Sequence, residues 1–269
     1  NKFTVAIFVA ILIWACTSQK ESALDQQLTE NIQNASKSGD ISEYIMPDGK
    51  DLSKIPNQDV KNPLNAAKVS LGKMLFFEPG IGLAGNNKKL RQTYSCSSCH
   101  VPERGFTAGR FQGIADGAIG FGNSGEGREK DPDYAGSEVD AQGARPLTMH
   151  NLAYVTNALW AGTFGSFGVN IGTENVWEQA DTLVRINKQG LQGLEANNQR
   201  ALVVHRQLMN PQIADTLGYK PFFDAAFPEI PAPERYSLKT VAFAIAAFQR
   251  TILTNQAPFQ QWLRGEKEA

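Results

Sequence analysis

Cysteine and histidine are scarce in this chain, with three of each among 269 residues. Two of the cysteines, Cys96 and Cys99, stand beside His100, and the third, Cys16, lies near the N-terminus. So few cysteines leave no disulfide framework to find. The small number of histidines also makes any search for metal ligands short.

An excess of charge of either sign is also missing. The chain has 26 Lys and Arg residues against 27 Asp and Glu residues, which gives a formal net charge of −1. There is no basic footprint, and this excludes nucleic acid as a partner. Patterns typical of strands are scarce too, so the sequence predicts a mostly α fold. Its length allows one large domain or two small ones.

The residues Cys96-Ser97-Ser98-Cys99-His100 form a C-x-x-C-H motif. If this stretch is helical, the two cysteines lie one turn apart on one face, where two thioether bonds can hold the vinyl edge of one porphyrin. In an exported protein the motif is typical of covalently attached haem c, with His100 as the proximal iron ligand. A thioredoxin-like redox pair would need a surrounding βαβ pattern, and a zinc site would need further Cys or His at short spacing. The motif therefore predicts one haem c in this chain.

The N-terminus carries the one long apolar run of the sequence, Phe3 to Ala15, which follows Lys2. At about 13 residues the run is shorter than the roughly 20 that span a bilayer, but it fits the apolar region of a signal peptide. Because Cys16 follows directly, residues 1–15 resemble a bacterial lipoprotein signal, which predicts a lipid anchor on Cys16. An ordinary secretory signal or a short anchor is the alternative. Every version exports the protein, so we expect a periplasm-facing, membrane-anchored lipoprotein.

The remaining chain divides into a polar tether and lead-in, residues 16–54, and a haem domain over residues 55–269. Caps and apolar spacing predict four helices in that domain. They run from Asn62 to Glu78, from Thr173 to about Gln189, from Leu194 past His205 to Met209, and onward from Ser237. A Gly- and Asp-rich stretch, Gly109 to Arg145, is predicted to be a functional loop that wraps the haem edge or shapes access to its open face.

Four stretches, in this order, resemble the N-terminal haem domain of the bacterial di-haem cytochrome c peroxidase and MauG-like family. They are Leu71 to Pro79; Ser95 to His100 with Phe106-Thr107; Asn151 to Tyr154 leading to Trp160-Ala161-Gly162; and Ala242 to Thr251 with Pro258-Phe259 and Leu263 to Gly265. The C-x-x-C-H motif alone occurs in many cytochromes, whereas this ordered set is much more specific.

The resemblance implies a cytochrome c-like domain with long irregular loops that reduces hydrogen peroxide to water, using electrons from a small cytochrome or cupredoxin donor. It makes the haem on His100 the peroxidatic one and places Trp160 in an electron path between two haems; a packed core aromatic is the alternative. No second C-x-x-C-H occurs before Ala269, so we expect the sequence to stop where a second haem domain begins, or to be a mono-haem relative. The family also suggests a homodimer and a calcium site, although Pro146 stands where an Asn is expected after Arg145.

A peroxidase needs an open or releasable sixth iron position and a group that moves a proton between the peroxide oxygens. The family's distal histidine has no counterpart, since no His lies between Val101 and Met149. Glu195 matches the family's distal acid, and His205 or His150 is the candidate distal iron ligand. The alternative for each histidine is a satisfied buried or surface imidazole, and the alternative for Glu195 is a solvated carboxylate at the start of a helix. Weaker candidates are Gln199 and Gln207 for hydrogen bonding, and Met149 and Met209 as thioether ligands.

Two rival functions remain beside the peroxidase. The first is a membrane-tethered electron carrier or haem sensor with one haem, which would show low-spin methionine ligation unchanged by peroxide. The second is a MauG-like oxidase that uses the same haem to oxidise a protein or another substrate.

Overall fold

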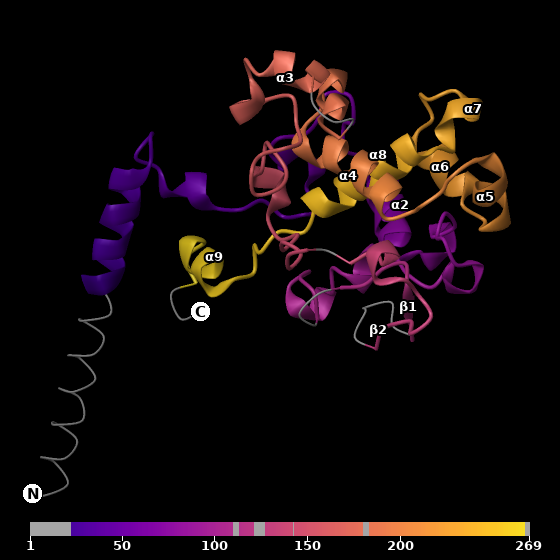
Figure 1. Ribbon diagram of the computed structural model, residues 1–269. Helices are drawn as coiled ribbons and strands as arrows, with labels where there is room; N and C mark the ends of the chain where they lie inside the picture. The colour runs from indigo at the N-terminus through magenta and orange to yellow at the C-terminus, as the bar shows by residue number, and fades with distance from the viewer. Residues whose placement is uncertain (1–22, 110–112, 121–126, 142, 180–182, 267–269) are drawn as a thin grey trace, which may run out of the picture. The chain divides into compact units, whose positions relative to one another are not determined.

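The computed structural model describes residues 23–109, 113–120, 127–141, 143–179 and 183–266 (Figure 1). By their contacts these residues fall into two compact units. The larger unit is the described part of Pro47–Thr254, and the smaller one joins residues 23–46 to residues 255–266. Residues 255–266 thus group with the N-terminal segment, whereas the sequence predicts one domain over residues 55–269. The functional boundaries stay a prediction.

The fold is mostly α, as predicted. The α-helices are α2 (Ala66–Phe77), α3 (Glu174–Gln179), α4 (Gly193–Val204), α5 (Pro211–Thr216), α6 (Lys220–Ala226), α7 (Ala232–Arg235), α8 (Leu238–Arg250) and α9 (Pro258–Leu263). Short 3-10 helices connect them: η1 (Ile41–Tyr44), η2 (Leu52–Lys54), η3 (Pro79–Ile81), η4 (Lys88–Leu90), η5 (Cys96–Ser98), η6 (Pro102–Arg104), η7 (Gly136–Glu138), η8 (Leu152–Tyr154), η9 (Gly168–Asn170) and η10 (Val184–Gln189). Two two-residue strands, β1 (Ala118–Ile119) and β2 (Glu129–Lys130), pair antiparallel.

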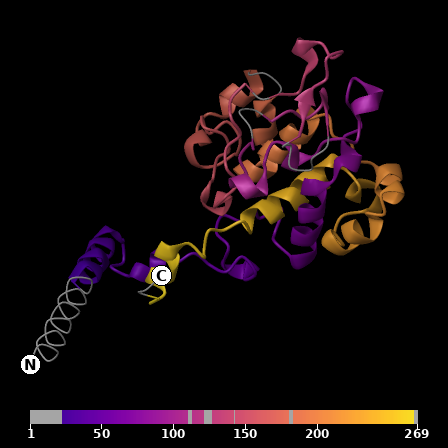
Figure 2. The same ribbon diagram turned by 90° about the horizontal axis from the view of Figure 1, so that it is seen from below.

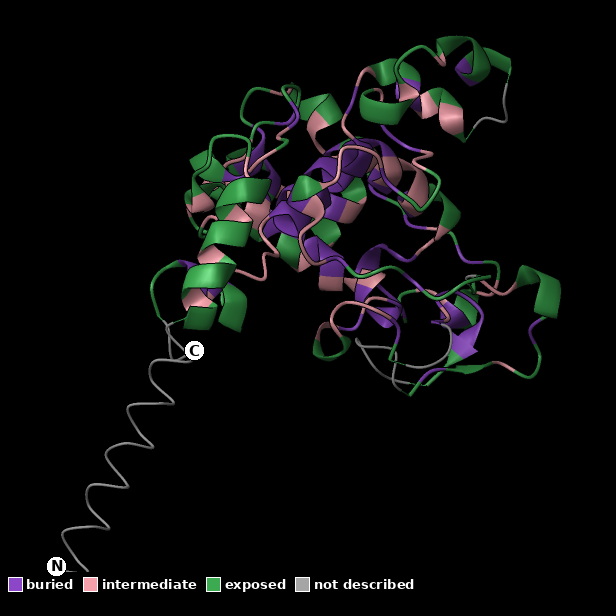
Figure 3. Cartoon of the chain, turned by 90° about the vertical axis from the view of Figure 1, so that its left-hand side faces the viewer, coloured by how far each residue is buried: buried purple, intermediate pink, exposed green. Residues whose placement is uncertain are grey.

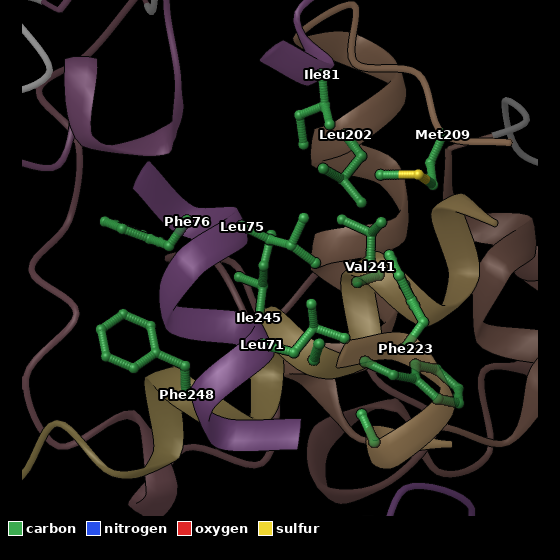
Figure 4. Packing of buried hydrophobic residues seen from close by; sticks show 14 of the residues in the cluster. Leu71, Leu75, Phe76, Ile81, Leu202, Met209, Phe223, Val241, Ile245 and Phe248 are labelled. Atoms are coloured by element: carbon green, nitrogen blue, oxygen red, sulfur yellow. The ribbon is translucent and has the colours of Figure 1, made fainter. Parts of the chain in front are cut away.

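The core of the larger unit lies between α2 and α8, and α4 and α6 pack against them. α8 is buried from Thr240 to Arg250, where most of its residues are apolar. Figure 3 shows buried residues, in purple, gathered along the central helices. Figure 2 shows α8, in yellow, crossing α2, in purple, and Figure 4 shows Leu75 of α2 near Val241 and Ile245 of α8. Phe76 and Phe248 meet edge to face, with ring centroids 5.5 Å apart.

The two central helices touch at Gly72 of α2, where no side chain would fit. A Cβ atom on Gly72 would lie 1.8 Å from the backbone oxygen of Ala244 in α8. Glycine therefore permits a backbone-to-backbone approach that any other residue would prevent. Because α2 also contacts η5, this crossing helps to position the C-x-x-C-H turn.

The first predicted helix begins later than expected. Asn65 and not Asn62 caps α2, since the Asn65 side chain accepts a hydrogen bond from the Lys68 amide at 2.7 Å. Asn62 is fully buried, and its amide nitrogen donates to Glu195 Oε1 and to the Phe243 carbonyl, each at 3.0 Å. This tertiary contact takes Asn62 away from capping. The predicted end of the helix at residue 78 is confirmed.

The helix predicted to run past His205 ends there instead, with His205 as the C-cap of α4. Arg206 adopts a left-handed φ of 55°, which an α-helix cannot continue through. The Arg206 carbonyl accepts hydrogen bonds from the Ala84 amide at 3.0 Å and from the Tyr94 hydroxyl at 3.3 Å, and its guanidinium pairs with Asp116. These contacts stabilise a turn at Arg206 that the helical spacing of apolar residues in the sequence does not predict.

The helix predicted from Thr173 to Gln189 is α-helical only in part. α3 forms its first part and the 3-10 helix η10 its last, while residues 180–182 lie outside the described part. Trp177 is buried and donates its indole N–H to Thr173 Oγ1 at 3.1 Å, and Gly190 ends the segment with a φ of 63°. The helix predicted to open at Ser237 is confirmed as α8.

The smaller unit ties the two ends of the described chain together. Residues 23–35 form a helix, and Trp262 of α9 donates its indole N–H to Asp25 at 2.7 Å. Gln260 bonds the Tyr44 carbonyl at 2.9 Å and the Met46 amide at 2.7 Å. Of the helices that the structure describes, none is long and apolar enough to cross a membrane. The predicted signal, residues 1–15, and the predicted lipidation site lie outside the described residues.

Candidate haem site

The C-x-x-C-H motif folds as a tight 3-10 turn over Cys96–Ser98 and not as an α-helix. The Ser95 amide donates to Ser98 Oγ at 3.0 Å, and the amides of Cys99 and His100 both donate to the Cys96 carbonyl, at 3.2 and 3.0 Å. Both cysteines are free thiols. These backbone hydrogen bonds stabilise a turn that carries two thiols and one imidazole within five residues.

The chemistry of the thiols argues against a redox pair. Burial raises the pKa of Cys96 and of Cys99 to about 12, so both thiols are protonated at neutral pH. A thioredoxin-like centre needs the opposite, a thiol pKa lowered toward 7 or below. Within the part of the chain that the structure describes, no group of three or more His, Cys, Asp or Glu side chains is placed to hold a metal ion. No described cluster thus favours zinc or the expected calcium.

His100 is prepared to bind iron through one particular nitrogen. Its Nδ1 lies 3.0 Å from the Phe106 carbonyl, which can only accept, so Nδ1 carries the proton and Nε2 carries the lone pair. A ligating histidine usually has its other ring nitrogen fixed in this way. Burial lowers the pKa of His100 to about 4, against the smaller opposing effects of the Phe106 and Leu147 carbonyls. The imidazole is neutral at pH 7, as ligation to iron requires, and these residues fit a haem c.

His150 lies next to the residue that holds His100. Its ring meets Phe106 edge to face with centroids 5.6 Å apart, and Gly105 lies beside it. The Thr148 hydroxyl donates to the Gly105 carbonyl at 2.6 Å and keeps this segment in place. These contacts place His150 beside the anchor of the proximal ligand, and so they disfavour it as a distal iron ligand.

His205 has a carboxylate partner that the sequence did not reveal. Its Nδ1 lies 2.9 and 3.1 Å from the two carboxylate oxygens of Asp140. The side chain of His205 is 30% exposed and that of Asp140 is 10% exposed, so the pair is partly shielded from water. His205 also contributes to the lowered pKa of His100, which puts the two imidazoles within electrostatic reach of one another. Asp140 escaped notice because it lies 65 residues from His205 in a loop without periodicity.

Glu195 lies inside the protein and is fully paired. Arg250 Nη1 and Nη2 donate to its two oxygens at 2.5 and 2.8 Å, and Asn62 donates to the first oxygen at 3.0 Å. Both charged side chains are buried, at 0% and 1% exposure. The pair joins α4 to α8, and the alternative of a solvated carboxylate is wrong because Glu195 is fully buried. The proton-transfer role itself stays a prediction.

Trp160 is one of the most exposed side chains of the described chain, with 95% of its surface accessible. It occupies a turn closed by a hydrogen bond from the Gly162 amide to the Leu159 carbonyl at 3.0 Å. The alternative of a packed core aromatic is therefore wrong. An aromatic ring left in water favours a functional role, but its place in an electron path is not tested by this position.

The weaker candidates belong largely to the core. Met149 and Met209 are both buried in the hydrophobic cluster, and Met149 Sδ accepts a hydrogen bond from Gln249 Nε2 at 3.5 Å. Gln199 donates to Gln189 at 3.2 Å. Gln207 is buried beside His205, and its Oε1 has no partner among the described residues. Packing thus accounts for the two methionines.

Two thiols and a neutral imidazole on one turn, held against a bundle of helices, define a c-type haem protein. The chain belongs to the family of di-haem cytochrome c peroxidases, whose family model matches residues 66–268. This family consists of oxidoreductases, and membership confirms the resemblance found in the sequence.

Several named relatives share the same region. The chain is 30% identical over 208 residues to the methylamine utilization protein MauG of Methylorubrum extorquens, covering 77% of this chain and 44% of that protein. It is 25% identical over 210 residues to MauG of Methylophilus methylotrophus, covering 78% and 47%. It is 28% identical over 211 residues to the cytochrome-c peroxidase IdrP1 of Denitromonas iodatirespirans, covering 77% and 42%. The chain thus spans less than half the length of these relatives.

Proposed function

We propose that this chain is the peroxidatic haem domain of a c-type haem peroxidase that reduces hydrogen peroxide to water. The observation that carries the proposal is the turn that brings the two thiols of Cys96 and Cys99 together with the His100 imidazole, whose Nδ1 is held by the Phe106 carbonyl. The His205–Asp140 pair adds a candidate group for proton transfer. The family supports it, because its name and one of the relatives are those of peroxidases.

The chain's own residues divide the work. Cys96 and Cys99 would hold the haem c by thioether bonds, and His100 would bind its iron through Nε2. When bound, the haem supplies the iron at which one peroxide molecule takes up two electrons and two protons and becomes two molecules of water.

His205 is the residue best placed to handle those protons. Its Nδ1–H points to Asp140, so Nε2 is the atom that can take a proton and return it. Asp140 is itself fixed, since its amide donates to the Asp116 carbonyl and its carbonyl accepts from the Ala115 amide, both at 2.9 Å. Asp140 is thus a positioning residue that holds one tautomer of His205. His205 as a distal iron ligand remains the alternative use of the same nitrogen.

The electrons come from a small cytochrome or cupredoxin donor in this proposal. They pass through a second haem domain of a longer protein and reach the haem along a path that includes Trp160. Haem c attachment takes place outside the cytoplasm, so we place the protein in the periplasm with a lipid on Cys16. Calcium and a homodimer complete the family pattern and stay predictions.

The proposal is tested with the chain produced together with a c-type maturation system. We expect a covalent haem whose spectrum changes on addition of hydrogen peroxide, and peroxide consumption with a chemical electron donor. His100→Ala should lose the proximal ligand and the activity. A low-spin spectrum that peroxide leaves unchanged would instead establish the electron carrier, and the peroxidase proposal would be lost.

The proton-handling pair has its own test. Asp140→Asn keeps the size of the side chain but removes its charge, so we expect peroxide reduction to slow about tenfold to a hundredfold. His205→Gln, which removes the imidazole, should slow peroxide reduction at least as much. Glu103→Gln, a change outside the pair, is the control. Unchanged rates in both variants of the pair would remove it from the mechanism.

A second candidate function is oxidation of another substrate by the same haem. It is favoured by the two relatives named methylamine utilization proteins. Peroxide that is consumed without an added electron donor, in proportion to an oxidised protein product, would distinguish this function from peroxide reduction.

A further inference from the structure

A guanidinium is buried close to the haem-attachment turn with no carboxylate paired to it in the described chain. Arg128 directly precedes β2 and is 0% exposed. Its Nε donates to the Ile114 carbonyl at 2.9 Å and its Nη2 to the Ala115 carbonyl at 2.7 Å. Its remaining acceptors are the carbonyls of Ala118, Gly120 and Thr93 and the Thr93 hydroxyl. The hydrogen bonds of Arg128 thus go to neutral oxygens.

This guanidinium joins the segments on the two sides of Cys99. Gly113, next to Ile114, packs so closely on Cys99 that a Cβ on Gly113 would lie 2.4 Å from the Cys99 Sγ. Thr93 precedes the motif by three residues.

The hydrogen bonds explain why a hydrogen-bond donor is buried at position 128, but they do not explain why that donor carries a positive charge. Burying an ion without an opposite charge is among the most unfavourable changes in a protein, whereas an uncharged amide can donate to carbonyls at much lower cost. Among the described residues, the carboxylate that acts on Arg128 is that of Asp116, and it already binds Arg206 and the Tyr134 hydroxyl. The charge of Arg128 is therefore not neutralised by an ion pair within the described residues.

We propose that Arg128 raises the reduction potential of the haem held by Cys96 and Cys99. A ferric haem core carries one net positive charge and a ferrous core none, so a fixed cation nearby disfavours the ferric state. Because the guanidinium is buried, salt and water screen it little. The surroundings of a haem are a known means of tuning its potential. This inference rests on the haem of the proposed function and does not require peroxide chemistry.

The test is a potentiometric titration of the haem-loaded chain, in which the electrode supplies the single electron. Arg128→Gln should lower the midpoint potential of the haem by at least about 59 mV. For a one-electron couple this shift corresponds to a tenfold lower ferrous-to-ferric ratio at a given electrode potential. Arg128→Lys keeps the charge and should stay near the wild-type potential. Arg235→Gln is the control, since Arg235 pairs with Asp224 on the surface.

Equal shifts of the potential in Arg128→Lys and Arg128→Gln would overturn the inference, because the geometry of the loop and not the charge would then set the potential. No shift in either variant would overturn it as well. If Arg128→Gln does not fold, Thr93→Asp and Thr93→Asn replace it. Thr93 is exposed, and its hydroxyl lies 3.4 Å from Arg128 Nη2, so the carboxylate should pair with the guanidinium and lower the potential. Equal potentials in these two variants would also overturn it. A chain that takes up no haem contradicts the proposed function instead.

Discussion

At the scale of single residues, the larger unit tolerates buried charges in three different ways. Glu195 and Arg250 neutralise each other in a bidentate pair. Lys68 is 2% exposed and pairs with the exposed Glu229, with 3.5 Å between the charged atoms. Arg128 donates only to neutral oxygens among the described residues, namely carbonyls and the Thr93 hydroxyl. These differences lead to different expectations when each charge is removed.

Breaking the Glu195–Arg250 pair should be strongly destabilising. Glu195→Gln leaves the Arg250 guanidinium buried without a counter-charge, so we expect a loss of about 3–5 kcal/mol in the free energy of unfolding. Adding Arg250→Met should recover part of that loss, because no unpaired charge then remains. Denaturant unfolding of the haem-loaded variants measures both. A stable Glu195→Gln variant that loses peroxide reduction would return Glu195 to the proton path.

Lys68 should make the stability depend on pH in the alkaline range. Burial lowers its pKa in the folded protein, and Glu229 opposes this shift only in part. Between that lowered pKa and the ordinary value near 10.5 the unfolded chain binds the additional proton, so the free energy of unfolding due to Lys68 rises with pH. Below this window the whole cost of burying the charge is present.

Lys68→Met should remove that pH dependence. At pH 7 we expect the variant to equal the wild type or exceed it by about 1 kcal/mol, because an apolar side chain of similar length fills the space beside Phe227. The difference should shrink as the pH approaches 10. Urea unfolding at several pH values gives the two curves, and Lys239→Met, an exposed lysine over Phe243, is the control. Parallel curves for wild type and Lys68→Met would contradict the assignment.

At the scale of elements, the long helices of the larger unit, α2, α4 and α8, could be predicted from the sequence, but their ends could be predicted only in part. α8 has both a local cap at Ser237 and an unbroken apolar stretch, so local and tertiary preferences agree. α2 and α4 end or begin where a tertiary contact overrides the local pattern, at Asn62 and at Arg206. The same limit applied to the site. The motif residues could be found from their spacing, whereas Asp140 is brought to His205 by the fold alone.

The crossing of α2 and α8 should be sensitive to one methyl group. In Gly72→Ala the new Cβ would meet the Ala244 backbone oxygen, so the helices must move apart and disturb the core that positions η5. We expect a loss of at least about 3 kcal/mol in stability and a lower yield of haem attachment. Thermal unfolding and haem absorbance per mole of protein measure these effects.

The matched control for that variant is Gly136→Ala. A Cβ on Gly136 would meet nothing within 4 Å, and its φ is not positive. Its stability should stay within about 0.5 kcal/mol of the wild type. If Gly72→Ala behaved like this control, the close approach of the two helices would not be a feature of the protein in solution.

At the scale of the whole molecule, the larger unit contains both a buried helical core and a group of large apolar side chains left in water. Val169 and Ile171 are exposed at 72% and 69%, and they lie close in sequence to the turn that carries Trp160. Gly162 of that turn also packs on Val169. Monomeric soluble proteins seldom leave such residues together on a surface without a function. This supports reading Trp160 as a residue that meets another haem domain or a donor.

Trp160→Ala should therefore separate function from stability. Its side chain makes little contact, so we expect the free energy of unfolding to stay within about 0.5 kcal/mol of the wild type. Trp177→Ala, which empties a buried site, should cost about 3–5 kcal/mol. Stopped-flow measurements should use the longest form of the protein that can be loaded with haem. In Trp160→Ala, the rate at which a donor protein reduces the haem should fall at least tenfold. Reduction by dithionite, which needs no path through the protein surface, should be unchanged. Equal donor rates in Trp160→Ala and wild type would exclude Trp160 from the electron path and leave its exposure without a redox explanation.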